Sequence, residues 1–306
     1  MSANSISARS PLQGGHPFDL EDDQAYQRWR EWKLGALPGS LDELRVEIDD
    51  PASLTEAERR AIVALCRRTN LAIYRVRRGI ERPQTTLRQL GARFGLRTLD
   101  VNPYADDEGV SAIQALESGK GAEYIPYTTR RLGWHTDGYY NDLGHLIRGM
   151  VLYCQRTAKE GGESLLLDHD LVYIQLRDRD PDLVAALMEN DAMSIPGNDF
   201  DEAVSRGRSG GPVFSTDPVT GALHMRYTAR TRSIQWKEGK RHRAALEALQ
   251  ELISDEADYV WRYRLEPGEG LICNNVLHRR TGFVDPPEGP GRLVYRMRFF
   301  ERIADT

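Results

Sequence analysis

The chain has 306 residues, 40% of them hydrophobic and 28% charged, with a formal net charge of −5, which is typical of a globular protein. Its mean hydropathy of −0.56 and the lack of an apolar run of about 18 residues argue against a membrane span. The acidic balance argues against a dedicated nucleic-acid-binding protein. Three widely spaced cysteines without a CxxC pair favour neither a disulfide framework nor a thiolate zinc site.

The first hundred residues predict a helical layer. The polar segment 1–15 has no apolar stretch of the kind found in signal peptides, so we expect it to be disordered and the protein to be cytoplasmic. Residues 19–35, with acids early and a lysine late, predict a helix. A capping-box sequence, SLTE, introduces an amphipathic helix over 54–69. A strand at 71–76 and a short helix at 85–94 follow.

From about residue 110 the pattern changes to short apolar strands separated by turn residues. Helices interrupt this pattern at 169–190 and 240–254. With no long linker in the chain, we expect a single domain over residues 1–306 that is mainly β with flanking helices, a sandwich or jelly roll. The strands are expected at 110–116, 145–155, 164–168, 211–216, 222–228, 259–265, 270–278 and 292–300.

Two histidines and an aspartate form a candidate metal site. In the sequence GWHTDG, His135 and Asp137 lie two residues apart, where side chains of a strand point the same way and could share one ion. Alone, this pattern is equally consistent with a surface loop carrying a solvated aspartate. His278 follows an apolar segment, and a lone histidine there is more often structural than a ligand. Together the three would leave coordination positions open, which suits Fe(II) and oxygen chemistry.

The segment RLVYRMRFF at 292–300 alternates between two kinds of side chain. Arg292, Arg296 and Arg298 share one face, and the leucine, tyrosine, methionine and phenylalanine between them share the other. We expect the apolar face to pack in the sandwich core. Because three arginines are costly to bury without anions, their face is either a solvated edge or a pocket floor that binds a carboxylate.

In combination, the motifs WHTDG, GGES, NNVLHRRTGF and GRLVYR resemble those of the taurine dioxygenase/2,4-D dioxygenase (TauD/TfdA) and clavaminate synthase group, over about residues 120–300. Members of this group are Fe(II)- and 2-oxoglutarate-dependent oxygenases with a double-stranded β-helix (jelly-roll) core. The resemblance implies that His135, Asp137 and His278 are the iron ligands. It also implies that Arg292 binds the distal carboxylate of 2-oxoglutarate.

The resemblance extends to two further residues. Ser164 matches a hydroxyl that the family places after a Gly-Gly pair, also on the distal carboxylate. Arg296 matches a second family arginine, which contacts either the cofactor or an anionic substrate. Along the sequence, Arg292 and Arg296 lie slightly further from His278 than the corresponding arginines of the taurine type do. This spacing is that of the clavaminate type. Which contact Arg296 makes is therefore left open, and taurine is disfavoured as the substrate.

The expected activity is oxidation of a C–H bond in a small, anionic metabolite, using Fe(II), 2-oxoglutarate and O2 and releasing succinate and CO2. A carboxylate at Asp137 favours hydroxylation, or a related desaturation or cyclisation, over halogenation, because related halogenases have a small residue there. The family usually builds its lid from the region corresponding to residues 168–258. Candidate substrate contacts are Tyr127, Arg131, Tyr139, Asn141 and Arg230.

Two other classes stay open at this point: a zinc-dependent hydrolase or isomerase with the same ligands, and a catalytically silent jelly-roll binding protein. Arg292 and Ser164 argue against the first, and the complete ligand set argues against the second. As partners we expect a small-molecule substrate and, from the family, a homo-oligomer, with neither nucleic acid nor membrane. Cys154 and Cys273 are expected to be core thiols, and His169 a surface residue.

Overall fold

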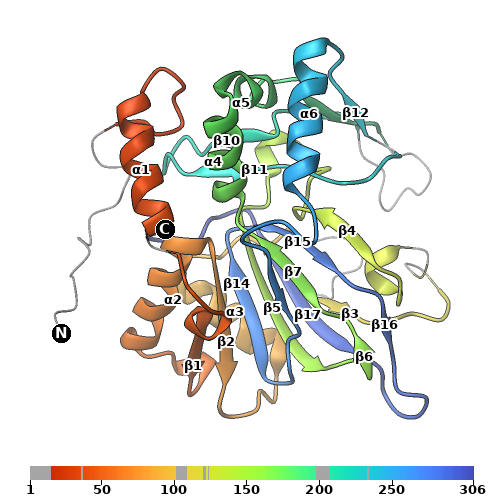
Figure 1. Cartoon of the computed structure of the whole chain (residues 1–306). Coiled ribbons are helices and arrows are strands. Elements are labelled where there is room, and N and C mark those ends of the chain that lie inside the picture. The colour runs from red at the N-terminus through yellow and green to blue at the C-terminus, as the bar shows by residue number, and fades with distance from the viewer. Residues whose placement is uncertain are drawn as a thin grey trace.

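A computed structural model describes residues 15–35, 37–100, 109–119, 122, 124–197, 207–232 and 234–306. The segment expected to be disordered, 1–15, lies outside the described residues except for its last position. Among the helices of the described part, none is long and apolar enough to cross a membrane. The chain forms a mixed arrangement of helices and strands in which two larger sheets lie at the centre (Figure 1).

The larger sheet has six strands, which are antiparallel except for the first pair. Their order across the sheet is β1 (Arg45–Ile48), β2 (Leu71–Val76), β14 (Glu269–Cys273), β5 (Gly149–Arg156), β17 (Leu293–Phe299) and β3 (Ser111–Ile113). The N-terminal and C-terminal parts of the chain therefore meet in one sheet. β17 lies between two neighbours, so it is not an edge strand.

The second sheet has four antiparallel strands and carries most of the candidate site. Their order is β13 (Trp261–Tyr263), β7 (Ser164–Leu167), β15 (Leu277–Arg280) and β4 (Leu132–His135). Leu166 of this sheet packs with Ile73, Met150 and Leu271 of the larger sheet in one buried cluster. The two sheets therefore face each other across an apolar interior.

Helices α2 (Glu56–Thr69) and α3 (Pro83–Arg93) cover the outer face of the six-stranded sheet. The capping box of α2 is formed by Thr55 and Glu58, two residues later than the SLTE sequence predicts. The side chain of Thr55 accepts from the backbone of Glu58, and the Glu58 carboxylate accepts from the backbone of Thr55. The helix accordingly begins at Glu56 and not at residue 54.

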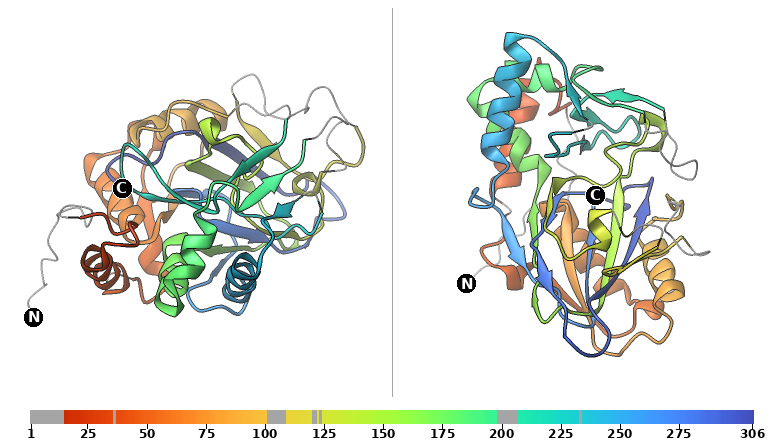
Figure 2. Two further views of the ribbon diagram at one scale, coloured as in Figure 1. Left: turned by 90° about the horizontal axis from the view of Figure 1, so that it is seen from above. Right: turned by 90° about the vertical axis from the view of Figure 1, so that its right-hand side faces the viewer.

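A second group of helices gathers at the other end of the molecule (Figures 1 and 2). It comprises α1 (Asp23–Gly35), α4 (His169–Arg179), α5 (Pro181–Leu187) and α6 (Lys240–Leu252). Their apolar side chains pack with the outward-facing Leu165 and Leu167 of β7. The segment predicted as helical over 169–190 holds two helices, because Asp180 is extended and caps a new helix that starts at a proline.

Short elements complete the described structure. The two-stranded pairs are β6 (Glu160–Gly161) with β16 (Phe283–Val284) and β10 (Phe214–Thr216) with β11 (Leu223–Met225). The three-stranded sheet consists of β12 (Gln235–Trp236), β8 (Met193–Ile195) and β9 (Ser209–Gly211). Single 3-10 turns span Leu41–Leu44, Pro51–Ser53, Ile125–Tyr127 and Leu143–His145.

A buried ionic cluster ties the first helix to the rest of the chain. Lys33, with none of its side chain exposed, lies 2.6 Å from Asp168 and 2.7 Å from Asp170. The amide of Asn70 donates to both carboxylates at 2.8 Å. His169 is buried beside them, 1% exposed, so the expectation of a surface histidine is wrong. Because each charge has a partner, burial of this cluster is compatible with a stable fold.

Candidate active site

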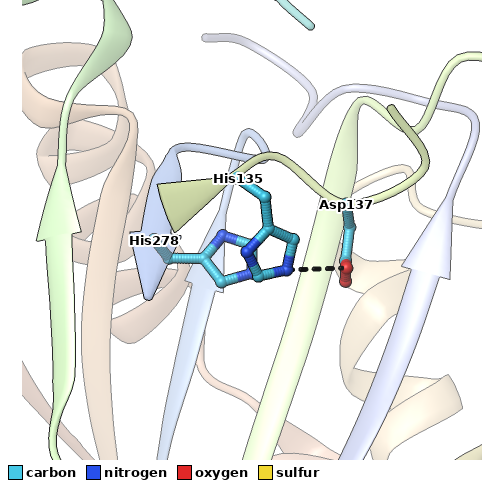
Figure 3. Close-up of side chains that lie close together, drawn as sticks. All are labelled: His135, Asp137 and His278. Carbon is cyan, nitrogen blue, oxygen red and sulfur yellow. Dashed lines mark ion pairs between the residues drawn. The ribbon is translucent and has the colours of Figure 1, made fainter. Parts of the chain in front are cut away.

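Pairing of β4 with β15 brings the three candidate metal ligands together. His278 lies opposite His135 in the register of the two strands, and their ring centroids are 4.3 Å apart. Asp137 follows two residues after β4, and its carboxylate lies 3.7 Å from Nε2 of His135. One ligand atom from each of the three residues lies within 4.8 Å of the others (Figure 3). This spacing is compatible with ligation of one ion.

Both histidines are oriented by the backbone in the same way. Nδ1 of His135 lies 2.9 Å from the carbonyl oxygen of Gly133, and Nδ1 of His278 lies 2.9 Å from that of Val276. A proton on Nδ1 satisfies each carbonyl and leaves Nε2 with its lone pair free. This is the tautomer that metal-ligating histidines adopt when their other nitrogen has an outer partner.

The electrostatics of the cluster also favour ligation. Nη1 of Arg296 lies 3.2 Å from both carboxylate oxygens of Asp137. Burial alone would raise the pKa of Asp137, but Arg296 and the His135 ring outweigh it and hold that pKa well below its ordinary value. Burial and the adjacent His135 lower the pKa of His278 to about 4. At neutral pH the cluster therefore offers one carboxylate and a neutral His278 imidazole, as a divalent metal requires.

A residue that the sequence analysis did not single out holds Asp137 in place. The buried side chain of Asn275 accepts from the backbone nitrogen of Asp137 at 2.8 Å and donates to its carbonyl at 2.9 Å. It also donates to the carbonyl of Ile147 at 2.7 Å. Asn275 has a φ of 51°, a left-handed conformation that asparagine tolerates better than most residues. This turn separates β14 from β15, so the strand predicted over 270–278 is broken there.

The arginine face of β17 points into the space between the two sheets. Val294 of that face packs with Cys154 and Tyr127 in an interior cluster. The opposite face, with Met297 and Phe299, packs instead under α2 and α3, so the expectation that it lines the sandwich interior is wrong. Arg292 and Arg298 are only 8% and 4% exposed, which rules out the alternative of a solvated edge.

Arg292 and Ser164 line one small cavity. Ser164 lies on the same face of its sheet as His278, because β7 pairs with β15 in that register. Nη1 of Arg292 is buried and has no hydrogen-bond partner among the described residues. A buried guanidinium nitrogen without a partner is costly, so the cavity is chemically suited to an anion such as a carboxylate.

The Gly-Gly pair before Ser164 is required by the backbone around this cavity. Gly161 and Gly162 have φ angles of 71° and 74°, which side chains disfavour. A Cβ on Gly161 would lie 2.3 Å from the carbonyl oxygen of Gly282, and one on Gly162 would lie 3.3 Å from Nε of Arg292. The pair therefore lets the chain pass directly against the Arg292 guanidinium.

The candidate substrate contacts fall into two groups. Tyr139 packs edge-on to the His135 ring with centroids 6.5 Å apart, and the exposed Arg230 lies 5.9 Å from the Tyr139 ring. Tyr127 is buried; burial raises its pKa, and the charge of Arg296 partly opposes that rise. Asn141 instead donates to the carbonyl of His145 at 2.9 Å, and Arg131 is exposed. The structure therefore brings Tyr139, Arg230 and Tyr127 toward the cluster and gives Asn141 a role in its own loop.

The chain resembles known proteins in sequence. The family model of taurine catabolism dioxygenases, TauD, TfdA family, matches residues 34–298. A uridine-5'-phosphate dioxygenase from Amycolatopsis sp is 34% identical over 176 residues, which are 55% of this chain and 60% of that protein. A second uridine-5'-phosphate dioxygenase, from Streptomyces sp, is 31% identical over 214 residues, 66% of this chain and 74% of that protein. The first match thus spans less than two thirds of its relative's length.

The fold resembles solved structures at low sequence identity. Asparagine oxygenase in complex with Fe(II), 3-hydroxyasparagine and succinate matches with a TM-score of 0.60 and 16% identity, over 94% of this chain and 87% of that one. The non-heme iron oxygenase OrfP with Fe, succinate and (3S)-hydroxy-L-Arg also matches with a TM-score of 0.60 and 16% identity, over 93% and 90%. At this identity the likeness concerns the fold alone.

Proposed function

We propose that this chain, which belongs to the TauD/TfdA family of dioxygenases, is an Fe(II)- and 2-oxoglutarate-dependent oxygenase. The observation that carries the proposal is the buried cluster of His135, Asp137 and His278, with ligand atoms within 4.8 Å and both Nδ1 atoms facing backbone carbonyls. Two imidazoles and one carboxylate fit Fe(II) and leave positions for other ligands. Bound iron would supply the activation of O2, which side chains cannot perform.

The role of the arginine pocket in this proposal is to bind the co-substrate. Arg292 would pair with the distal carboxylate of 2-oxoglutarate, and the hydroxyl of Ser164, from the same cavity, would donate to it. The 2-oxo acid end of the molecule would then lie toward His278, which is on the same sheet face as Ser164. Arg296, which donates to the carboxylate of Asp137, would help to keep the Asp137 carboxylate ionised.

The substrate in this proposal is a small anion, with a nucleoside 5'-phosphate as the first candidate. The two relatives are uridine-5'-phosphate dioxygenases by name. Tyr139, which packs edge-on to the His135 ring, would provide an aromatic surface for such a molecule, and Arg230, whose guanidinium lies 5.9 Å from the Tyr139 ring centroid, would provide a cation. A lid over it would come from the segment 168–258, of which residues 198–206 and 233 lie outside the described residues, and within it from the parts other than α4, α5 and α6, which pack on the outward face of β7. The fold proposed for the whole chain is a single domain with a jelly-roll core.

The test is a succinate-forming assay with Fe(II) and 2-oxoglutarate across a panel of anions that includes uridine-5'-phosphate. We expect substrate-dependent succinate formation and a product that gains one oxygen atom; loss of two hydrogens would instead indicate desaturation or ring closure. Asp137→Ala and Arg292→Ala should both abolish turnover, whereas Arg262→Ala, a change at an exposed residue, should not. Unchanged succinate production in Asp137→Ala would refute the assigned ligand, and activity with zinc alone would favour the hydrolase alternative.

A further inference from the structure

A second arginine reaches the cavity that Arg292 and Ser164 line. Arg264 lies immediately after β13, the strand that pairs with β7 at Ser164. Its side chain lines the same cavity, together with Cys154 and Leu265. The charge of Arg264 acts on Arg292, whose pKa is lowered mainly by burial and to a lesser degree by this neighbour. Two arginines therefore line one small cavity, Arg292 from a buried position and Arg264 with 33% of its side chain exposed.

The hydrogen bonds of Arg264 leave part of its guanidinium unused. Nη2 donates to the carbonyl of Ala158 at 2.5 Å. Nε lies 3.8 Å from the carboxylate of Glu266, which is too far for a hydrogen bond. Nε is also buried and has no hydrogen-bond partner in the part of the chain that the structure describes. Like Nη1 of Arg292, it is a charged donor held away from water, and such donors favour an anionic acceptor.

The other groups around the cavity neutralise this pair only in part. Burial raises the pKa of the Cys154 thiol to about 11, so at neutral pH the thiol carries no charge. The Glu266 side chain is 60% exposed, and water screens its charge. Asp285 accepts from the backbone nitrogen of Arg292 at 2.7 Å, and its charge offsets that of the guanidinium only in part, because burial still lowers the pKa of Arg292. The cavity is therefore positively charged on two sides.

We propose that Arg264 is a second binding residue for the distal carboxylate of 2-oxoglutarate, acting beside Arg292 and Ser164. The inference rests on the proposed function and adds a specificity element to it. A carboxylate has two oxygens, and guanidinium groups from two separate segments can each donate to one of them. The pair thus selects a 2-oxo dicarboxylate over a 2-oxo acid that lacks the distal carboxylate.

The test is a binding measurement on the protein loaded with Mn(II), without O2, so that no turnover occurs. The affinities of 2-oxoglutarate and of 2-oxobutyrate, which has no distal carboxylate, are measured by calorimetry. In Arg264→Gln we expect 2-oxoglutarate to bind about 10- to 100-fold more weakly, the range for a lost hydrogen bond to a charged group, with 2-oxobutyrate unchanged. Arg264→Lys should recover part of the loss, since it keeps the charge without the planar fork.

Arg262→Gln provides the matched control. Arg262 lies two residues earlier, is exposed and pairs with Glu163 at 3.2 Å, so its loss should leave both affinities unchanged. An Arg264→Gln protein that binds 2-oxoglutarate as tightly as wild type, or that loses affinity equally for both 2-oxo acids, would overturn the inference alone. Failure of the wild-type protein to bind 2-oxoglutarate would overturn the proposed function and, with it, this inference.

Discussion

Replacement of Asn275 by alanine should weaken both the fold and the metal site. The side chain is 1% exposed and makes three hydrogen bonds, two to the backbone of Asp137 and one to that of Ile147. At a net value of about 1 kcal/mol each, their loss costs about 3 kcal/mol. The φ of 51° adds about 1 kcal/mol, because alanine tolerates a left-handed backbone poorly. We therefore expect the free energy of unfolding to fall by about 4 kcal/mol.

Urea denaturation measures this loss, and Asn275→Gly separates its two parts. Glycine removes the same hydrogen bonds but accepts the positive φ, so Asn275→Gly should be about 1 kcal/mol more stable than Asn275→Ala. Because the side chain fixes the backbone of Asp137, Mn(II) affinity should also fall, by about 10- to 100-fold if Asn275 behaves as outer partners of metal ligands do.

The neighbouring Asn274 supplies the control. It is equally buried but bonds to Asn70, Thr306 and Ile303 and not to the Asp137 segment. Asn274→Ala should therefore destabilise the fold while leaving Mn(II) affinity unchanged. An Asn275→Ala protein with the stability and Mn(II) affinity of wild type would show that this side chain does not hold the site.

Other consequences can be measured by denaturation. Lys33→Met leaves Asp168 and Asp170 buried without the lysine that pairs with both, although the charge of Arg302 still acts on them. The change should cost about 3–5 kcal/mol, and an unchanged free energy of unfolding would contradict the ionic cluster. Burial lowers the pKa of His224 to about 3, so below about pH 6.5 the unfolded chain binds a proton that the folded one does not. Stability should fall as the pH drops from there toward 3, and His224→Gln should make that dependence shallower, while His278, whose pKa is also lowered, keeps part of it. Thr55→Ala removes the capping box and should lower the free energy of unfolding by about 1 kcal/mol. A decrease too small to measure would argue that the capping box does not stabilise the fold.

The sequence predicted features that depend on neighbouring residues, such as the alternation of side chains along a strand, better than features that depend on distant contacts. The alternation in residues 292–300 correctly placed Arg296 and Arg298 on one face of β17, and Arg292, directly before the strand, lines a cavity together with Val294 of that face. The packing of the opposite face against α2 and α3 depends on helices distant in sequence. Leu143–His145 forms a 3-10 turn, so the strand predicted over 145–155 begins only at residue 149. The break between β14 and β15 arises from Asn275, whose hydrogen bonds reach 138 and 128 residues back along the chain, and no local spacing reveals it.

In the candidate site, too, the sequence predicted the ligand residues but not the contacts that orient them. Spacing and resemblance singled out His135, Asp137 and His278, which the structure brings together, while their roles as iron ligands stay a prediction. The contacts that orient them come from Gly133, Val276 and Asn275, whose types carry no chemical signal in sequence. His169 was misassigned because its local sequence resembles an exposed helix start, whereas the packing of α4 buries it.

The most direct test of the account is the absorption spectrum of the protein with Fe(II) and 2-oxoglutarate in the absence of O2. Coordination of the 2-oxo acid to iron at this cluster predicts a visible charge-transfer band, which zinc cannot give. The band should disappear in His278→Ala and persist in His145→Ala, a change at an exposed histidine that pairs with Asp142. Absence of the band in the wild-type protein, or its persistence in His278→Ala, would show that this cluster does not bind iron with 2-oxoglutarate.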